Sequence, residues 1–414
     1  MVLGKREIFN HKLMVIFMKA IVNGTILCPK QGKIKRGTVL FNEGKIKAVG
    51  RGEEIQIPET TEILDVNGKF IVPGFVDAHT HQGLFDGSIG WAGEDGNEMT
   101  DPVTPQMRGL DSFNPNEPSI RTDVLRGGVT CLNTGPGSGN VISGQALIIK
   151  PISKVIDEMI VKSPSGLKIA LGENPKRVHG KENKRMPSTR MGVAALLRTT
   201  FTEAQNYIRE QESYNERKAL AEKKETLPPA PPKIDLKMEI VAKVIKKEIP
   251  IHAHCHRSDD IATIIRITEE FGLDLVLIHG TDSAEIASYI ASKNIPVVYG
   301  PTLFWVSKQE TANRSFKTPV ILNKAGVKVA LQTDSLTPMN FFPLLPMFVI
   351  KEGMTREDAL KCVTINPAEI LKIDDRVGSL EVGKDADIVI WSGDPFEFYS
   401  QVENVYINGE EMHF

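Results

Sequence analysis

Two histidines, His79 and His81, close an apolar and β-branched segment that begins at Ile71. On a β-strand, residues i and i+2 project from the same face, so both imidazoles point the same way. Two neutral imidazoles that converge on one point suit a borderline-soft divalent metal ion. An isolated pair of this kind could equally be two surface histidines, so the rest of the chain must decide between the two interpretations.

Three further apolar runs also end in residues that can bind metals. Counted together with His79 and His81, six of the nine histidines lie at the ends of apolar runs. Core or surface histidines have no reason to prefer that position. The residues in these three runs are His252, His254, His256, His279 and Asp334. Strands that each end in a metal-binding side chain are typical of a parallel barrel with its chemistry at the carboxyl face.

Eight candidate strands, with helices between them, would position these residues. The expected strands span 71–78, 129–133, 146–150, 167–172, 249–254, 275–279, 295–299 and 328–333. We therefore predict an α/β fold with a (β/α)8 TIM-type barrel over residues 71–373. Short β-runs in 18–70 and 374–414 predict a discontinuous small β-sandwich domain formed by both chain ends. We interpret residues 1–17 as an N-terminal extension that carries no targeting signal.

The whole pattern resembles the amidohydrolase superfamily of metal-dependent hydrolases, and within it the imidazolonepropionase-like branch. The resemblance rests on a His-x-His pair on the first barrel strand, a histidine on each of the fifth and sixth strands, and an aspartate on the eighth. The segment from Gly378 to Trp391 resembles the closing segment of that superfamily. Together these motifs cover nearly everything from Met18 to the C-terminus.

The resemblance implies a site for one or two divalent ions per chain, with zinc the expected metal. It places His79, His81 and Asp334 on one ion, and gives Asp334 the role of catalytic base toward the metal-activated water. Asp334 could otherwise cap a helix. A second ion would take His279 and one histidine of the fifth strand. The context Ile-His-Ala favours His252 for this role, although 252, 254 and 256 share a face.

A site with two ions also needs a bridging anion from the third or fourth strand. Many members of the superfamily use a carboxylated lysine there, and others use a glutamate. Lys168 and Glu173 both lie in the fourth candidate strand or directly after it. We favour Glu173 as the metal ligand because it stands where the strand ends, and keep Lys168 as the alternative. Lys150, at the end of the third strand, is a weaker third choice.

Several residues near the strand ends are candidates for substrate binding. Guanidinium and ammonium groups suit carboxylate or phosphate, so an anionic substrate group is a reasonable expectation. The candidate residues are His254, His256, Arg257, Lys176 and Arg177. For any single basic residue in this set, solubility of the loop is the competing explanation.

The resemblance implies a hydrolase that cleaves a C–N bond, in an amide or cyclic amide of a small molecule, by a metal-activated hydroxide. One alternative is a mononuclear deaminase of the same superfamily. Another, from a different class, is a catalytically silent homologue that serves in binding or assembly. The complete ligand set argues against the silent homologue, and the metal stoichiometry would separate the first two.

Composition excludes several other classes of partner. The formal net charge is −2 and 25% of residues are charged, which leaves no electrostatic footprint for nucleic acid or a membrane surface. The four cysteines are widely spaced and read as free thiols, so we expect a cytoplasmic location. A homo-oligomer remains open.

Two insertions interrupt the barrel pattern. Residues 82–120 follow the first strand and should overhang the metal site, because loops this long in a compact domain are usually functional. Residues 174–233 contain a charged segment of helical composition, Ala194 to Lys224, followed by a proline-rich stretch. We expect the charged face of that helix to be solvated.

Overall fold

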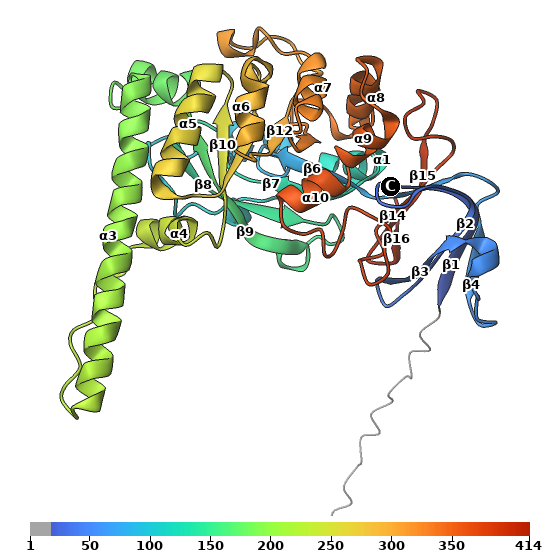
Figure 1. Ribbon diagram of the computed structural model, residues 1–414, viewed down its shortest axis with the longest axis horizontal. Helices are drawn as coiled ribbons and strands as arrows, with labels where there is room; N and C mark the ends of the chain where they lie inside the picture. The colour runs from blue at the N-terminus through green and yellow to red at the C-terminus, as the bar shows by residue number, and fades with distance from the viewer. Residues whose placement is uncertain (1–17) are drawn as a thin grey trace, which may run out of the picture.

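The computed structural model describes residues 18–414, in which a barrel stands beside a second β-sheet (Figure 1). The predicted N-terminal extension, 1–17, lies outside the described residues. Within the described residues, no helix combines the length and the apolar character that crossing a bilayer would require. The four cysteines are buried and unpaired; the cytoplasmic location stays a prediction.

The barrel consists of eight strands that follow one another around the sheet in chain order. They are β6 (Phe75–Thr80), β7 (Val129–Thr134), β8 (Ile142–Ile149), β9 (Ile160–Ala170), β10 (Ile251–Cys255), β11 (Leu275–His279), β12 (Val297–Tyr299) and β13 (Val329–Leu331). The predicted barrel is confirmed. Its two end strands, β6 and β13, are joined by a hydrogen bond from the Asp334 N–H to the carbonyl oxygen of His79, 3.2 Å long.

One strand departs from the predicted parallel arrangement. β8 runs antiparallel to both of its neighbours, β7 and β9. The chain between the end of β7 and the start of β8 spans only 135–141, and a crossover between parallel strands needs a dozen or more residues. The reversal carries the end of β8, and with it Lys150, to the opposite end of the barrel from the other strand ends.

The second sheet joins strands from both ends of the chain, as predicted. It contains β1 (Lys19–Cys28), β2 (Gly32–Asn42), β3 (Lys45–Arg51), β4 (Glu62–Asp65), β5 (Phe70–Pro73), β14 (Ile388–Trp391), β15 (Val402–Ile407) and β16 (Glu410–Met412). Their order is β16-β15-β14-β5-β1-β2-β3, with β4 paired to β1. This sheet is thus one hydrogen-bonded unit built from segments more than 300 residues apart in the chain.

The predicted first barrel strand, 71–78, is divided between the two sheets. Residues to Pro73 form β5, which pairs with β1 and β14, and the barrel strand β6 starts at Phe75. Gly74 lies between them, and a Cβ there would come within 2.0 Å of the Thr130 hydroxyl oxygen. Only glycine allows the chain to pass this close to β7. Because β5 pairs within the second sheet, we propose that the small domain extends to Pro73.

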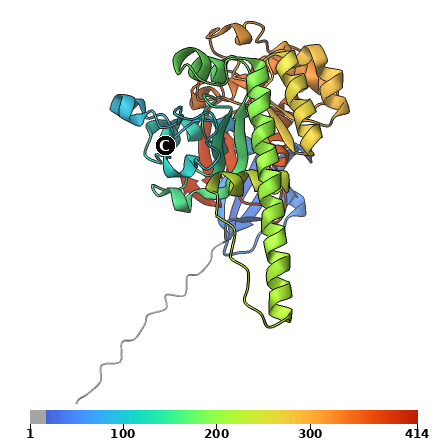
Figure 2. The same ribbon diagram turned by 90° about the vertical axis from the view of Figure 1, so that its left-hand side faces the viewer.

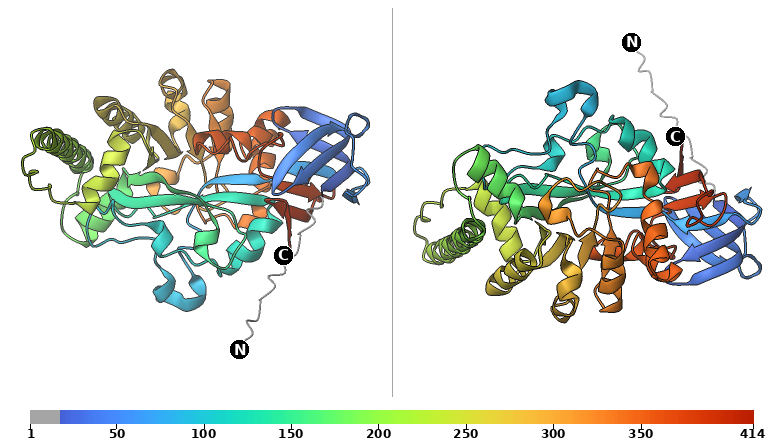
Figure 3. Two further views of the ribbon diagram at one scale, coloured as in Figure 1. Left: turned by 90° about the horizontal axis from the view of Figure 1, so that it is seen from below. Right: turned by 90° about the horizontal axis from the view of Figure 1, so that it is seen from above.

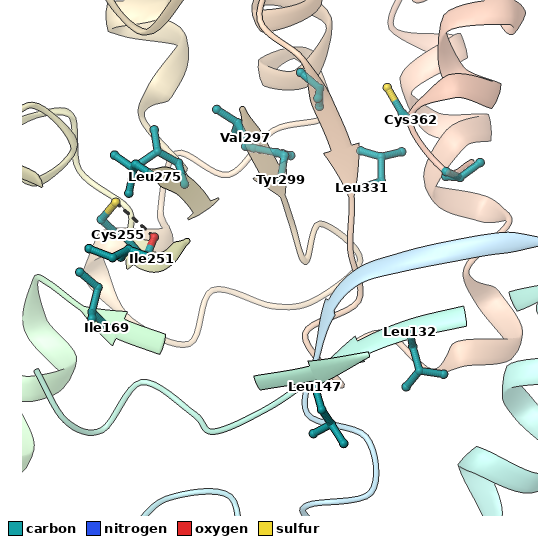
Figure 4. Close-up of a cluster of buried hydrophobic side chains, with 14 of the residues drawn as sticks. Leu132, Leu147, Ile169, Ile251, Cys255, Leu275, Val297, Tyr299, Leu331 and Cys362 are labelled. Carbon is teal, nitrogen blue, oxygen red and sulfur yellow. Dashed lines mark hydrogen bonds between the residues drawn. The ribbon is translucent and has the colours of Figure 1, made fainter. Parts of the chain in front are cut away.

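Alternation along the barrel strands separates an apolar layer from the polar interior. On β10, Ile251, Ala253 and Cys255 belong to the main hydrophobic core, and His252 and His254 have the opposite orientation. Figure 4 shows part of this apolar layer, with Ile251 and Cys255 near Leu275 of β11. Packing of this layer against the surrounding helices thus turns the histidines inward.

Helices follow most of the barrel strands and cover the outside of the barrel (Figure 1). They are α1 (Val124–Arg126), α2 (Glu173–Pro175), α3 (Arg190–Lys223), α4 (Leu236–Ile245), α5 (Ser258–Phe271), α6 (Ala287–Ser292), α7 (Lys317–Lys324), α8 (Leu344–Lys351), α9 (Arg356–Lys361) and α10 (Ile365–Ile370). The predicted charged helix in the second insertion is α3, which begins four residues earlier than expected.

α3 extends well beyond the body of the barrel (Figure 2). It has 34 residues, which corresponds to about 51 Å of helix. Apart from Ala221, its buried side chains lie in the first half, from Val193 to Ala204, and the charged second half is largely exposed. The views from below and above place α3 and the second sheet at opposite ends of the molecule (Figure 3).

A buried ionic network joins the barrel to the second sheet. Lys150 is fully buried, and its ammonium lies 2.7 Å from an Asp385 oxygen and 2.9 Å from an Asp387 oxygen. Arg376 and Lys45 also pair with Asp385, at 2.9 and 2.6 Å. Lys150 is therefore engaged at the end of the barrel away from the other strand ends, which leaves it no part in bridging metal ions there.

We predict that Lys150→Met destabilises the fold. Asp385 would keep Arg376 and Lys45, but Asp387 would be left buried without a cation, which costs about 3–5 kcal/mol. Urea unfolding followed by circular dichroism should show a clearly lower midpoint. Lys47→Met removes an exposed lysine of β3 and should change the midpoint little. Equal stability of the two variants would contradict the structural role of Lys150.

Candidate metal centre

The strand ends β6, β10, β11 and β13 bring together two adjacent groups of side chains that could hold metal ions. The first group consists of His79, His81 and Asp334, and the second of His254, His256 and His279. In each group the potential ligand atoms lie within 4.8 Å of one another. The rings of His79 and His279 are 5.7 Å apart between centroids, so the two groups form one continuous centre.

In the first group, both imidazoles face the same carboxylate oxygen. The Nε2 atoms of His79 and His81 lie 3.3 and 3.2 Å from Oδ1 of Asp334. His81 directs its Nδ1 to the carbonyl oxygen of Gly135 at 2.7 Å, which leaves the Nε2 lone pair toward the centre. Although burial alone raises the pKa of Asp334, the imidazoles of His279, His79 and His81 hold that pKa well below its ordinary value.

Asp77, buried below the first group, joins the strands that carry it. Its carboxylate accepts a hydrogen bond from the Thr333 hydroxyl at 2.5 Å and another from the backbone N–H of His79 at 3.1 Å. Burial raises the pKa of Asp77 to about 7. Asp77 thus fixes β6 against the end of β13, and so His79 against Asp334. No sequence signal marks Asp77 as part of the site, because an aspartate two residues before the histidine pair has no motif of its own.

In the second group, two histidines are oriented by outer hydrogen bonds. The Nδ1 atoms of His256 and His279 lie 2.8 Å from the Thr281 hydroxyl and 2.7 Å from the Gly300 carbonyl oxygen. Burial lowers the pKa of His279 to about 3 and lowers those of His254 and His256 well below their ordinary value. All three imidazoles are therefore neutral at pH 7, the form in which histidine binds metals.

Unpartnered ring nitrogens test whether these residues fit a metal ion. Within residues 18–414, Nδ1 of His254 and the Nε2 atoms of His252 and His256 are buried and have no hydrogen-bond partner. Buried polar atoms normally have one, and an absent ion is a recognised reason for the exception. Neutral imidazoles oriented by outer hydrogen bonds, with one carboxylate, are a donor set suited to zinc and similar divalent ions. The residues present therefore fit the metal.

Lys168 of β9 reaches into the centre from the side. Its ammonium nitrogen lies 2.9 Å from Nε2 of His79, and the residue is almost completely buried. Burial lowers the pKa of Lys168 to about 7, so a large share of its amine is neutral at physiological pH. Lys168 is the alternative bridge that the sequence predicts, and the structure brings it to the ligand groups.

Two of the expected ligands, His252 and Glu173, are not brought to the ligand groups found within residues 18–414. His252 is two residues deeper in the barrel than His254, and its ring packs against Gly166, where a Cβ would come within 2.6 Å of it. β9 ends at Ala170, and Gly172 then turns the chain with a φ of 85°. That turn places Glu173 in α2, on the wall above the centre.

A cavity of about 640 Å³ opens over the two groups. Its wall includes His81, His254, His256 and Asp334, with Phe85 and Asn97 from the 82–120 insertion and Glu173 and Arg177 from the segment after β9. The insertion therefore overhangs the centre, as expected. Arg177 is also paired with Glu182, 2.6 Å away. Lys176 and Arg257 do not line this cavity, and Arg257 pairs with Asp259 at 2.8 Å.

The same wall contains cationic residues that no sequence motif predicts. Lys308 and Arg314 lie in the segment after β12, together with Asn174 on the facing side. Burial lowers the pKa of Lys308 to about 8. No sequence signal separates these residues from other loop lysines and arginines, because they stand nine or more residues beyond the end of their strand.

Comparisons with known proteins relate this chain to the amidohydrolases. Residues 186–412 match the sequence profile of the amidohydrolase family. The crystal structure of an amidohydrolase from Thermotoga maritima MSB8 shares 45% sequence identity and a TM-score of 0.89, over 95% of this chain and 99% of that one.

Two curated relatives are more distant. An imidazolonepropionase of Bacillus cytotoxicus is 24% identical over 91% of this chain and 89% of its own length. Amidohydrolase tasK of Hapsidospora irregularis is 28% identical over 90% of this chain, but the match spans only 39% of the tasK chain.

Two histidines on the same strand allow a direct test of the ligand assignment. His254→Asn should lower the bound metal by about one ion per chain, because it removes an imidazole from the second group. His252→Asn, two residues deeper on β10, should leave the metal content unchanged. Elemental analysis of both purified variants beside the wild type measures this. Loss of metal from the His252 variant alone would restore the assignment made from the sequence.

Proposed function

The chain belongs to the amidohydrolase family of hydrolases that act on C–N bonds, and we propose that it cleaves an amide or cyclic amide of a small molecule. The observation that carries this proposal is the pair of adjacent ligand groups that opens to one cavity, with the Lys168 amine beside His79. We propose His79, His81 and Asp334 as ligands of one divalent ion, and His254, His256 and His279 as candidate ligands of a second, zinc in both cases.

A bound divalent ion supplies polarisation of the substrate's carbonyl group and a water molecule whose pKa falls to near 7. The chain's own groups complete the chemistry. Asp334 is ionised at neutral pH, since its pKa lies well below the ordinary value, so it can accept the proton of the attacking water. The same carboxyl group can then donate that proton to the departing nitrogen.

Lys168 replaces Glu173 as our proposed bridging residue. A neutral amine can add to carbon dioxide and lose a proton, which yields a carbamate whose single negative charge is shared by two oxygens. Burial keeps much of the Lys168 amine neutral at pH 7, and its position beside His79 would place the carbamate among the ligand groups. Glu173 lacks such a position, because the turn at Gly172 sends it to the cavity wall.

The two ligand groups also help to judge the two alternative functions, a mononuclear deaminase and a catalytically silent binding protein. A mononuclear deaminase needs only one ion, and the second group of three inward imidazoles would then have no metal to hold. The presence of both groups therefore favours a site for two ions. The complete set of buried donor atoms also argues against a catalytically silent binding protein, for which these unpartnered ring nitrogens would bring only a desolvation cost.

The choice between Lys168 and Glu173 can be made by mutation. Lys168→Ala should lower the metal content and abolish activity, because it removes the carbamate. Glu173→Gln should keep the metal, since its carboxylate stands outside the ligand groups. Metal uptake by chelator-treated wild-type protein should also fall in buffer freed of carbon dioxide. A Glu173 variant that loses metal while the Lys168 variant keeps it would reverse the assignment.

Asp334→Asn tests the proposed base. The amide keeps the shape of the side chain but cannot accept the proton, so kcat should fall by at least about 10²-fold on any substrate that the wild type hydrolyses. The variant should remain folded and keep part of its metal, because the imidazoles are untouched. Circular dichroism and elemental analysis accompany the kinetics. Full activity in a folded, metal-bearing variant would show that another group takes the proton.

A further inference from the structure

Two cations face the cavity above the metal centre and have no ionic partner among residues 18–414. The ammonium nitrogen of Lys308 lies 2.9 Å from the side-chain oxygen of Asn174 and 3.3 Å from Nε2 of His254. Arg314 donates to the carbonyl oxygen of Phe304 at 3.4 Å. Among the ion pairs formed by residues 18–414, with a limit of 4.0 Å, none includes Lys308 or Arg314.

The position of Lys308 is fixed by a network behind it. The short 3-10 helix Gln309–Thr311 follows directly, and the Thr311 hydroxyl donates to the carbonyl oxygen of Lys308 at 2.7 Å. Glu310 in turn pairs with Arg190 of α3 at 2.6 Å and accepts the backbone N–H of Glu173 at 3.0 Å. Lys308 is therefore held toward the cavity, unlike a lysine that extends freely into solvent.

Both cations are partly buried, which makes the absence of a counter-charge costly. A charged group removed from water is destabilising unless an opposite charge or several hydrogen bonds compensate for it. Asp334 is already engaged by the imidazoles, which leaves Glu173 as one carboxylate on this wall against two cations. An anionic ligand would supply the missing negative charge, and a guanidinium beside an ammonium suits a carboxylate.

We propose that Lys308 and Arg314 form a subsite for a carboxylate of the substrate, and that the enzyme acts on small amides that carry one, such as N-acyl amino acids. This inference rests on the proposed function and makes its substrate class specific. Because Lys308 contacts His254, a carboxylate bound by Lys308 would lie next to the metal centre. It would therefore be close to the scissile C–N bond, as the α-carboxylate of an N-acyl amino acid is.

Matched substrates test the proposal through activity. Metal-loaded wild-type protein is assayed on a panel of N-acetyl amino acids and on the corresponding N-acetyl amino acid amides, which lack the charge. We expect the carboxylates to be hydrolysed with at least about 10-fold higher kcat/KM, the lower range for hydrogen bonds to a charged group. Lys308→Met and Arg314→Gln should each remove most of this preference, and Lys308→Arg should keep much of it.

Lys317→Gln is the matched control, since Lys317 lies three residues beyond Arg314 but is exposed and does not line the cavity. It should retain the preference. Equal rates on carboxylates and amides in the wild type would overturn the proposal. So would a loss of rate in the Lys308 and Arg314 variants that is the same for both substrate types, because that result indicates a structural role.

A binding measurement separates this proposal from the proposed hydrolytic function. Calorimetric titration compares 3-phenylpropanoate with 3-phenylpropanol, neither of which has a C–N bond to cleave. The carboxylate should bind more tightly to the metal-loaded wild type, and Lys308→Met should weaken it by at least about 10-fold at unchanged metal content. Carboxylate binding without hydrolysis of any amide would refute the function and leave the subsite intact. Affinity unchanged in both the Lys308 and the Arg314 variant would refute the subsite.

Discussion

The seam between β6 and β13 is the interaction on which the rest of this centre depends. These strands come from opposite ends of the barrel's chain. All three residues of the first ligand group lie in β6 or within three residues of the end of β6 or β13. The Asp334 N–H donates to His79, the Ser335 hydroxyl accepts the N–H of His81 at 2.8 Å, and Asp77 accepts from Thr333. Because these bonds join the first barrel strand to the last, closure of the barrel and assembly of the ligand group are one event.

Three residues at the centre have a strained backbone conformation, and their place at the ends of barrel strands explains it. His279, Asp334 and Ser335 all have positive φ values, of 73°, 55° and 57°. Left-handed conformations are disfavoured for residues with a Cβ and persist where the surrounding structure holds them. Here the turns after β11 and β13 redirect the chain immediately after the strand, which keeps His279 and Asp334 at the rim and facing inward. Other non-glycine residues of the chain also have positive φ, but at these three positions the conformation sets the direction of side chains at the metal centre.

The reversed strand β8 has a consequence at the other end of the barrel. Its direction follows from a connection too short for a crossover, and it delivers Lys150 to the second sheet. There the buried lysine meets carboxylates from the C-terminal segment of the chain. The barrel and the sheet made from both chain ends are thus connected by an ionic contact. They are also connected by the chain itself, which passes from one sheet to the other at Gly74. The two ends of the barrel have separate tasks, chemistry at one and attachment at the other.

The sequence by itself determined which strands carry the chemistry, because apolar runs that end in histidine or aspartate are visible without any knowledge of the fold. It identified His79, His81, His254, His256, His279 and Asp334 as residues of the site, and the structure brings them together. The barrel and the small β-domain from both chain ends also followed from local patterns, since alternation and strand length depend on neighbouring residues.

Only the tertiary structure decided how deep each residue lies in the barrel, whether its side chain reaches the metal centre, and where the chain turns after each strand. His252 and Lys168 are in register on neighbouring strands, yet the long lysine side chain reaches His79 and the short imidazole does not. The turn at Gly172 places Glu173 outside the ligand groups found in residues 18–414, and a network that includes α3 brings Lys308 to the centre from a loop. Alternation gives the face of a strand on which a residue lies. Its height above the barrel floor depends on register, strand ends and loop paths, which are set by contacts between distant segments.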